Sequence, residues 1–197
     1  MKVRLIPVVL VALLMTLLVA AIFLQSDNNN SDEIIIDSSE NFSVFGFTWD
    51  NQPAYRYEVY NKNGAVVINE TVRSQPHIEY IFENTLLSII RGVGTNAFLC
   101  QYYDIDRDLF SEIFHSPTVA DHGNVVYMTI SEGNLKLVVR DIFDESKFYK
   151  EFGLDFSPTA VPSNALINAD YLDETSLTIT YFSGENYEIK STTLSLN

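Results

Sequence analysis

The stretch VVYMTISEGNLKLVVRDIFDESKFYKEF, residues 125–152, decides the fold. It contains three short segments, separated by polar turns at residues 131–134 and 143–146. Lys136 and Arg140 fall on one side of the central segment, and its other side is apolar. The apolar side consists of Leu135, Leu137 and Val139. A period of two residues is typical of strands, so the stretch predicts two consecutive hairpins of an antiparallel sheet.

Similar material recurs along the chain with a fixed period. Pro76, Pro117 and Pro158 are each 41 residues apart, and each precedes short alternating segments separated by turns. One more unit fits upstream, which gives four units of four short strands over residues 34–197. The second turns of the units are expected near residues 50–53, 91–96, 131–134 and 173–176. The third turns are expected near residues 61–64, 104–108, 143–146 and 183–186.

The second and third units also share side chains around their third turns. Asp104 and Ile105 align with Asp141 and Ile142, and an aromatic strand follows each turn. The aromatic pairs are Phe110 and Phe114 in one unit and Phe148 and Phe152 in the other. This element resembles Trp-Asp-repeat and Tol-type β-propellers, whose blades are four-stranded meanders of 40–45 residues. The resemblance implies a small all-β propeller. A β-sandwich or an open stack of sheets is the alternative.

The N-terminus predicts a membrane anchor. Lys2 and Arg4 precede an uncharged run at residues 5–24, which is long enough for a helix that crosses a bilayer. Positive charges before the run place the N-terminus in the cytoplasm and the rest of the chain outside. Residues 1–24 are therefore expected to form one transmembrane helix. Cleavage of this segment as a signal peptide, which would secrete the protein, is the alternative.

Residues 25–33 are polar and without periodicity, as in a tether, so an extracytoplasmic all-β domain is expected at residues 34–197. The formal net charge is −14, which disfavours nucleic acid as a partner and favours cations or basic protein surfaces. The single cysteine, Cys100, lies in an apolar run and excludes an intramolecular disulfide. It is expected to be a small buried residue.

In propellers of the kind that this chain resembles, the second turns and the links between blades share one face. That implies a loop face for binding, and the residues assigned to it are Trp49, Asp50, Arg73, His77, Arg91, His115, Glu132, Asp173 and Glu174. The opposite face would carry residues 104–108 and His122.

The sequence DIDRD at residues 104–108 has the alternating aspartates of some calcium loops. A complete EF-hand loop from Asp104 needs glycine and glutamate where Leu109 and His115 stand, so a hairpin turn is the favoured interpretation. Three histidines without metal-site spacing predict no zinc site. We therefore expect no cofactor and no metal.

The sequence favours a membrane-tethered binding module that recognises a protein or a glycan without a catalytic step. It contains no Gly-x-Ser-x-Gly elbow and no Gly-Lys-Ser/Thr phosphate loop. Two alternatives stay open: an exported hydrolase with convergent carboxylates, and an accessory subunit of a cell-envelope complex. The hydrolase would use two carboxylates, which carry no local motif.

Overall fold

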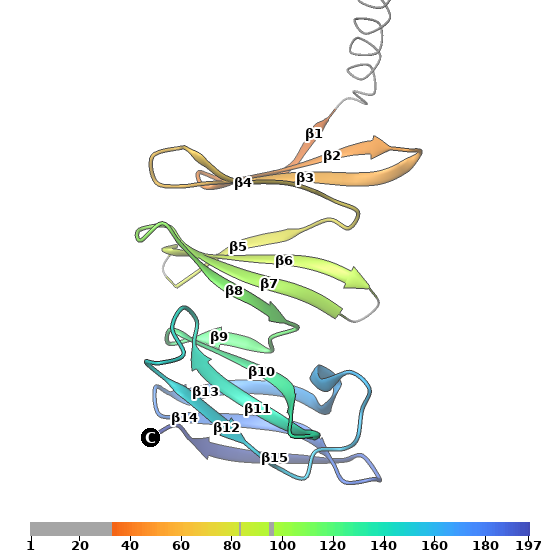
Figure 1. Ribbon diagram of the computed structural model, residues 1–197, viewed down its shortest axis with the longest axis vertical. Coiled ribbons are helices and arrows are strands. Elements are labelled where there is room, and N and C mark those ends of the chain that lie inside the picture. The colour runs from red at the N-terminus through yellow and green to blue at the C-terminus, as the bar shows by residue number, and fades with distance from the viewer. Residues whose placement is uncertain (1–32, 83, 95–96) are drawn as a thin grey trace, which may run out of the picture.

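A computed structural model describes residues 33–82, 84–94 and 97–197 of the chain. Within these residues the protein is all-β, with four antiparallel sheets that lie one above another in Figure 1. Each sheet is a meander of strands consecutive in sequence. The predicted anchor, residues 1–24, and nearly all of the tether lie outside the described residues. No helix among the described residues has the length and apolar character needed to cross a bilayer.

The first three sheets have four strands each. The first sheet contains β1 (Ile34–Ser38), β2 (Phe42–Trp49), β3 (Gln52–Tyr60) and β4 (Val66–Val72). The second sheet contains β5 (His77–Ile81), β6 (Leu86–Gly94), β7 (Ala97–Asp104) and β8 (Leu109–His115). The third sheet contains β9 (Val119–Asp121), β10 (Asn124–Ser131), β11 (Asn134–Asp141) and β12 (Tyr149–Phe152).

The fourth sheet has only three strands. It contains β13 (Leu166–Asp173), β14 (Ser176–Ser183) and β15 (Glu188–Ser195). The predicted first strand after Pro158 is absent, and a 3-10 helix, η1 (Pro162–Ala165), stands in that segment. Proline has no backbone N–H to give to a sheet and is well suited to the first turn of a helix. The prediction of four strands in every unit was therefore correct for three units and wrong for the fourth.

Tight turns set the register of several hairpins. Asp50 and Asn51 join β2 to β3, and both have positive φ, 55° and 57°. Glu132 and Gly133 join β10 to β11 in the same way, with φ of 52° and 77°. Two residues with positive φ form the type I′ turn that matches the twist of paired strands. The predicted second turns of the first and third units are thus confirmed.

Three separate apolar clusters hold the sheets together, one at each interface. The first and second sheets meet around Tyr57 and Tyr103, which are both fully buried. The second and third sheets meet around Cys100 and Phe114. The third and fourth meet around Leu137 and Ile179. Both faces of the two middle sheets are therefore buried, whereas each end sheet buries one face.

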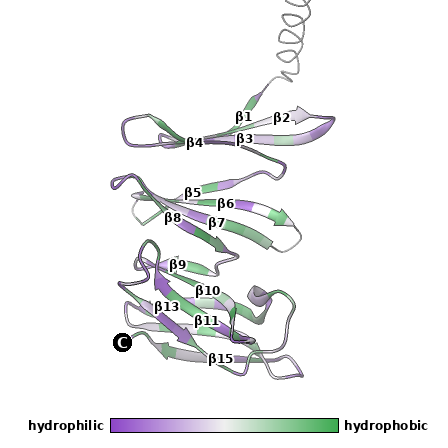
Figure 2. Cartoon of the chain, in the orientation of Figure 1, coloured by the Kyte–Doolittle hydropathy of each residue, from purple (hydrophilic) through white to green (hydrophobic). Residues whose placement is uncertain are grey.

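The expectation of a closed propeller ring is wrong, because the sheets form an open stack. Each cluster joins neighbouring sheets only, and none joins the first sheet to the fourth. A ring would bring the first sheet against the fourth, whereas in Figure 1 these two sheets lie at opposite ends of the stack. A single two-sheet sandwich is not formed either. Figure 2 shows apolar segments on the strands and hydrophilic ones at many of the turns.

The missing strand changes which side of the stack the last turns occupy. In a meander each strand runs opposite to the one before it. A unit that lacks its first strand therefore has its later turns on the opposite side of the stack from the matching turns of the other units. Leu196 N donates a hydrogen bond of 2.7 Å to Thr175 O, and the rings of Tyr171 and His122 lie 5.3 Å apart. The turn at residues 173–176 thus lies on the side of His122. The assignment of Asp173 and Glu174 to the other side is wrong.

Candidate functional site

The seven remaining residues of the predicted loop face lie along one long side of the stack. They are Trp49 at the end of β2, Asp50 in the next turn, Arg73 after β4, His77 at the start of β5, Arg91 near the end of β6, His115 at the end of β8 and Glu132 in the β10–β11 turn. The turns and links that carry them are on the right in Figure 1. Because sheets stack about 10 Å apart, the set extends over roughly 20 Å and three sheets. It is a side of the molecule, and only smaller groups within it are in contact.

Trp49 and Arg73 form one such group at the first sheet. The Arg73 guanidinium lies 4.3 Å from the centroid of the Trp49 ring, and its Nη1 donates a hydrogen bond of 3.1 Å to the Trp49 carbonyl. A guanidinium over an indole face is a favourable cation–π contact. Trp49 is still 49% exposed. Trp49 therefore presents an aromatic surface to solvent with a cation already fixed against it.

Arg91 belongs to a second group, between the first and second sheets. Its Nη1 lies 2.8 Å from Glu70 Oε2, to which the Tyr57 hydroxyl also donates a bond of 2.6 Å. Burial, together with the bond to Glu70, raises the pKa of Tyr57. Arg91 Nε is buried without a partner among the described residues. This group links β4 to β6 and holds Glu70 with two donors, so its role is to join the two sheets.

The two histidines of this side do not meet. His77 and His115 stand on the two edge strands of the second sheet, with β6 and β7 between them, about 14 Å apart at the usual strand spacing. His77 pairs with Ile90, and His115 pairs with Leu99, which itself pairs with Arg91. Neighbouring residues of a strand point to opposite faces, so the two histidines face different sheets. The hypothesis of a shared histidine site therefore has no geometric support.

Glu132 stands alone in its turn. Its carbonyl accepts a hydrogen bond of 3.2 Å from Asn134 Nδ2, and its positive φ helps to form the turn. It lies apart from the other six residues of the predicted loop face. The described residues contain no group of three or more His, Cys, Asp or Glu side chains placed to hold a metal ion.

The aspartates of residues 104–108 make turn contacts between β7 and β8. Asp104 Oδ1 accepts a hydrogen bond of 2.8 Å from Arg107 N. Asp108 Oδ1 accepts one of 2.6 Å from the Tyr103 hydroxyl, and Lys62 Nζ donates to the Asp106 carbonyl at 3.1 Å. The predicted hairpin turn is confirmed, and through Lys62 it also connects the second sheet to the first.

Cys100 is buried, as predicted, and only 1% of it is exposed. Its Sγ lies 3.6 Å from Ser88 Oγ, beside a cavity of about 270 Å³ between the second and third sheets. Burial raises the pKa of the Cys100 thiol. A thiol that stays protonated is a poor nucleophile, so Cys100 acts as a core residue.

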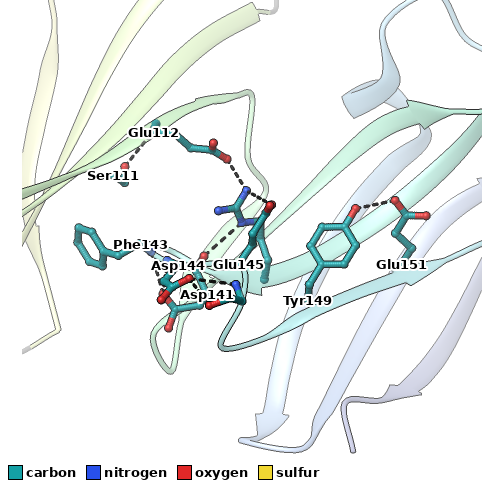
Figure 3. Close-up of polar contacts among 10 residues, drawn as sticks. Ser111, Glu112, Asp141, Phe143, Asp144, Glu145, Tyr149 and Glu151 are labelled. Atoms are coloured by element: carbon teal, nitrogen blue, oxygen red, sulfur yellow. Dashed lines mark hydrogen bonds and ion pairs between the residues drawn. The ribbon is translucent and has the colours of Figure 1, made fainter.

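The second and third sheets are also joined by a buried arginine that the sequence patterns did not single out. Arg140 is 7% exposed, and its Nη1 lies 2.5 Å from Glu112 Oε1 and 3.2 Å from Glu145 Oε2. Figure 3 shows Glu112 and Glu145 approaching this guanidinium from two different segments. Its Nε donates to the Asp141 carbonyl at 3.3 Å. One guanidinium therefore binds two carboxylates in an ion-paired group that joins the two sheets. Neither carboxylate is left free to act as a catalytic acid.

A groove lies on the first sheet, at the hairpin of β2 and β3. It has a volume of about 480 Å³, within the range of ligand pockets. Ile34 and Ile36 of β1 form one wall, and Pro53 and Tyr55 lie opposite. Gly46 forms the floor, because a Cβ at that position would lie 2.4 Å from Ile36 Cδ1. The absence of a side chain at Gly46 is what lets the isoleucine reach across the sheet.

Beside this groove, β1 exposes three consecutive isoleucines. Ile34, Ile35 and Ile36 are 63%, 66% and 39% exposed, and every residue of β1 is exposed. Other exposed large apolar residues of the described chain occur singly, which is normal for a protein surface. The sequence pattern does not reveal this exposure, because a run of isoleucines predicts a buried strand. The polar residues just before the run were the available signal, since they mark it as the first strand of the domain.

No known protein family, no curated protein and no solved structure matches this chain. The site is therefore characterised by its own geometry. That geometry combines an apolar edge strand, an adjacent groove and an exposed indole, all on the first sheet.

Proposed function

We propose that this protein is a membrane-tethered module, exposed outside the cytoplasm, that binds a protein partner through its first sheet. One observation carries the proposal: the exposed isoleucines of β1, the groove of about 480 Å³ and the exposed indole of Trp49 all belong to that sheet. Contiguous exposed apolar surface on a folded domain marks an interaction site. The stack of blade-like meanders then serves to present the first sheet to the partner, and this role needs no catalytic step.

The position of the first sheet in the chain supports the same proposal. β1 begins at Ile34, directly after the polar residues 25–33 that follow the apolar run. Nine residues reach at most about 30 Å when extended. A partner on the first sheet would thus be held close to the membrane surface, as an envelope-complex subunit requires.

A glycan is the second candidate, and Trp49 is the observation that favours it. Aromatic rings offer flat apolar faces against which a sugar ring can pack. Arg73 already covers one face of this indole at 4.3 Å, and the exposed isoleucines of β1 belong to the same sheet. Apolar aliphatic surface beside an aromatic residue suits a protein partner better.

Cross-linking in intact cells, with the full chain as bait, tests the proposed binding surface. Trp49→Ala removes an exposed aromatic side chain from the first sheet, and Tyr187→Ala removes one of similar exposure, 53%, beside the fourth sheet. We expect Trp49→Ala to reduce cross-linking to the partner at least five-fold and Tyr187→Ala to leave it unchanged. Equal loss in both variants would refute a first-sheet surface. Loss of cross-linking after enzymatic deglycosylation would favour the glycan.

Protease accessibility tests the placement of the domain. Protease added to intact cells should degrade residues 34–197 while the N-terminal residues stay protected. Degradation only after the cells are lysed would place the domain in the cytoplasm and contradict the proposal.

A further inference from the structure

We propose that the free edge of β1 pairs with an extended protein segment whose apolar centre is flanked by lysine or arginine residues. This inference rests on the proposed function and specifies the partner's chemistry. Among the residues that the structure describes, β1 is the terminal strand of its sheet and pairs with β2 alone. The outward N–H and C=O groups of such an edge are a template for another strand, and strand addition is a common mode of peptide recognition.

The side chains of β1 make this edge apolar on both faces of the sheet. Ile34 pairs with Gly46, and Ile35 pairs with Phe45, so the two isoleucines point to opposite faces. Ile36 reaches over Gly46 on the groove side. An added strand with apolar residues therefore finds isoleucine on either face, and on one face the apolar surface continues into the groove (Figure 2 shows the isoleucine run of β1 in green).

Three other edge strands of the stack are better protected. β9 has only three residues, β12 carries Lys150 and Glu151, and β15 carries Glu188 and Lys190. Short strands and charged side chains are the usual devices that prevent edge-to-edge pairing. β1 has a bulge between Ile35 and Asp37 and carries one charged residue, Asp37, but three of its five residues are exposed isoleucines. Among the described edges it is the one whose exposed residues are mainly apolar.

Charge determines which segment fits. Residues 33–76 contain six acidic and three basic residues. Of the acidic residues, Asp37, Glu40 and Asp50 are exposed and lie on β1, just after it and in the neighbouring hairpin turn. A second copy of this chain would bring the same acidic residues against them, and like charges repel. An extended segment with basic ends places its cations against these carboxylates, which is why we assign a basic-flanked partner rather than self-pairing.

A peptide titration tests the proposal on the full chain in detergent. The probe is a fluorescein-labelled peptide of nine residues with valine at three alternate central positions and two basic residues at each end. We expect saturable binding by fluorescence anisotropy. We also expect at least ten-fold weaker binding of a peptide with glutamate in place of the basic residues, and of one with proline at the central valine. Equal binding of all three peptides would overturn the proposal.

Two matched variants locate the binding. Ile35→Lys changes an isoleucine that is 66% exposed on β1, and Ile189→Lys changes one that is 68% exposed on the edge strand β15. We expect the peptide to bind Ile35→Lys at least ten-fold more weakly and Ile189→Lys as it binds the wild type. Equal weakening in both variants, or in neither, contradicts pairing at β1.

Hydrogen exchange separates strand addition from adhesion to apolar side chains. Bound peptide should slow exchange of backbone amides in residues 34–38, and unchanged exchange there would overturn the pairing. If the peptide fails these tests while Trp49→Ala still reduces cross-linking, this inference fails and the proposed function stands. If Trp49→Ala and Tyr187→Ala behave alike in cells while the peptide protects β1, the proposed function fails instead.

Discussion

The first and fourth sheets are the two ends of one stack, yet they cover their outer faces differently. On the fourth sheet the outer face carries hydroxyl groups: Thr178 Oγ1 lies 3.1 Å from Thr193 Oγ1, and Thr180 Oγ1 lies 3.4 Å from Ser191 Oγ. On the first sheet it carries Phe45, with the Arg56 guanidinium 4.1 Å from the centroid of its ring. Terminal units of stacked folds need a polar outer face to stay soluble.

The two end sheets thus use two different kinds of polar cover on their outer faces. Hydroxyls on short side chains such as threonine and serine are held close to the sheet and leave no apolar surface to uncover at these positions. An arginine laid over an aromatic ring is a long, flexible cover that a partner can displace. Arg56 is held in place by Glu33, whose Oε2 lies 2.7 Å from Arg56 Nη2. The fourth sheet is thus covered in part by fixed hydroxyls, although Ile189 is still exposed on the same face, whereas the first sheet is covered by a side chain that a partner can displace.

The largest expected effect is on stability, and it tests whether the two end sheets differ only on their outer faces. Ile179→Ala and Ile89→Ala each remove a fully buried isoleucine, at the third–fourth and first–second interfaces respectively. Truncation of a buried isoleucine costs about 2–5 kcal/mol. We expect losses within this range for both variants in urea unfolding followed by circular dichroism. A loss at Ile89 much smaller than at Ile179 would mean that the first sheet is loosely attached, which breaks the comparison.

A smaller effect is expected on the outer faces. Phe45→Ala removes a half-buried ring and its guanidinium contact, which together contribute about 1–2 kcal/mol. Thr180→Ala removes one weak hydroxyl contact and should stay within about 0.5 kcal/mol of the wild type. Thermal unfolding of the two variants measures the difference. Equal destabilisation would show that the aromatic and hydroxyl covers are energetically alike.

The smallest expected effect is electrostatic. Three hydrogen bonds, from Lys190, Ser183 and Tyr181 in decreasing order of effect, hold the pKa of Asp155 below its ordinary value, and Arg56 lowers the pKa of Glu33. Because both pKa values are lower in the folded state, the associated stability is present above the unfolded pKa values of about 3.9 and 4.3. It is lost as the pH falls through the folded values.

Carboxyl titration by NMR measures both groups. Lys190→Met should raise the midpoint of Asp155 and leave that of Glu33 unchanged. Lys150→Met is the control, since Lys150 contacts the Asn197 carbonyl instead of Asp155. An unmoved Asp155 midpoint in Lys190→Met would show that Ser183 and Tyr181 suffice to hold the carboxylate.

The sequence predicted the meanders well because their signals are local. The alternation of Leu135, Leu137 and Val139 and the turn of Glu132 and Gly133 depend only on neighbouring residues, and both are present as expected. Whether meanders close into a ring depends on how two sheets rotate against each other. That rotation is set by side chains on both faces, such as Arg140 between β8 and β11, and no period in the sequence reports it.

The errors in the last unit and at the candidate site have similar causes. Pro162 begins a 3-10 helix where the repeat predicted a strand, and that one change moved Asp173 and Glu174 to the other side. The long side with Trp49 and Arg73 was predictable from turn positions, whereas the separation of His77 and His115 depended on the pairing of edge strands. The exposure of Ile35 could not be read from its type, because an isoleucine run is the same on an edge as in a core.

The open stack also has a mechanical consequence. In the described part of the chain the first and fourth sheets are connected only through the two sheets between them, so a tensile load applied between the ends passes through three interfaces in series. Each interface has its own set of apolar side chains and contacts, with Arg140 and its two carboxylates bridging the middle one. The weakest of the three therefore sets the force at which the molecule lengthens, and the remaining sheets stay folded while it yields.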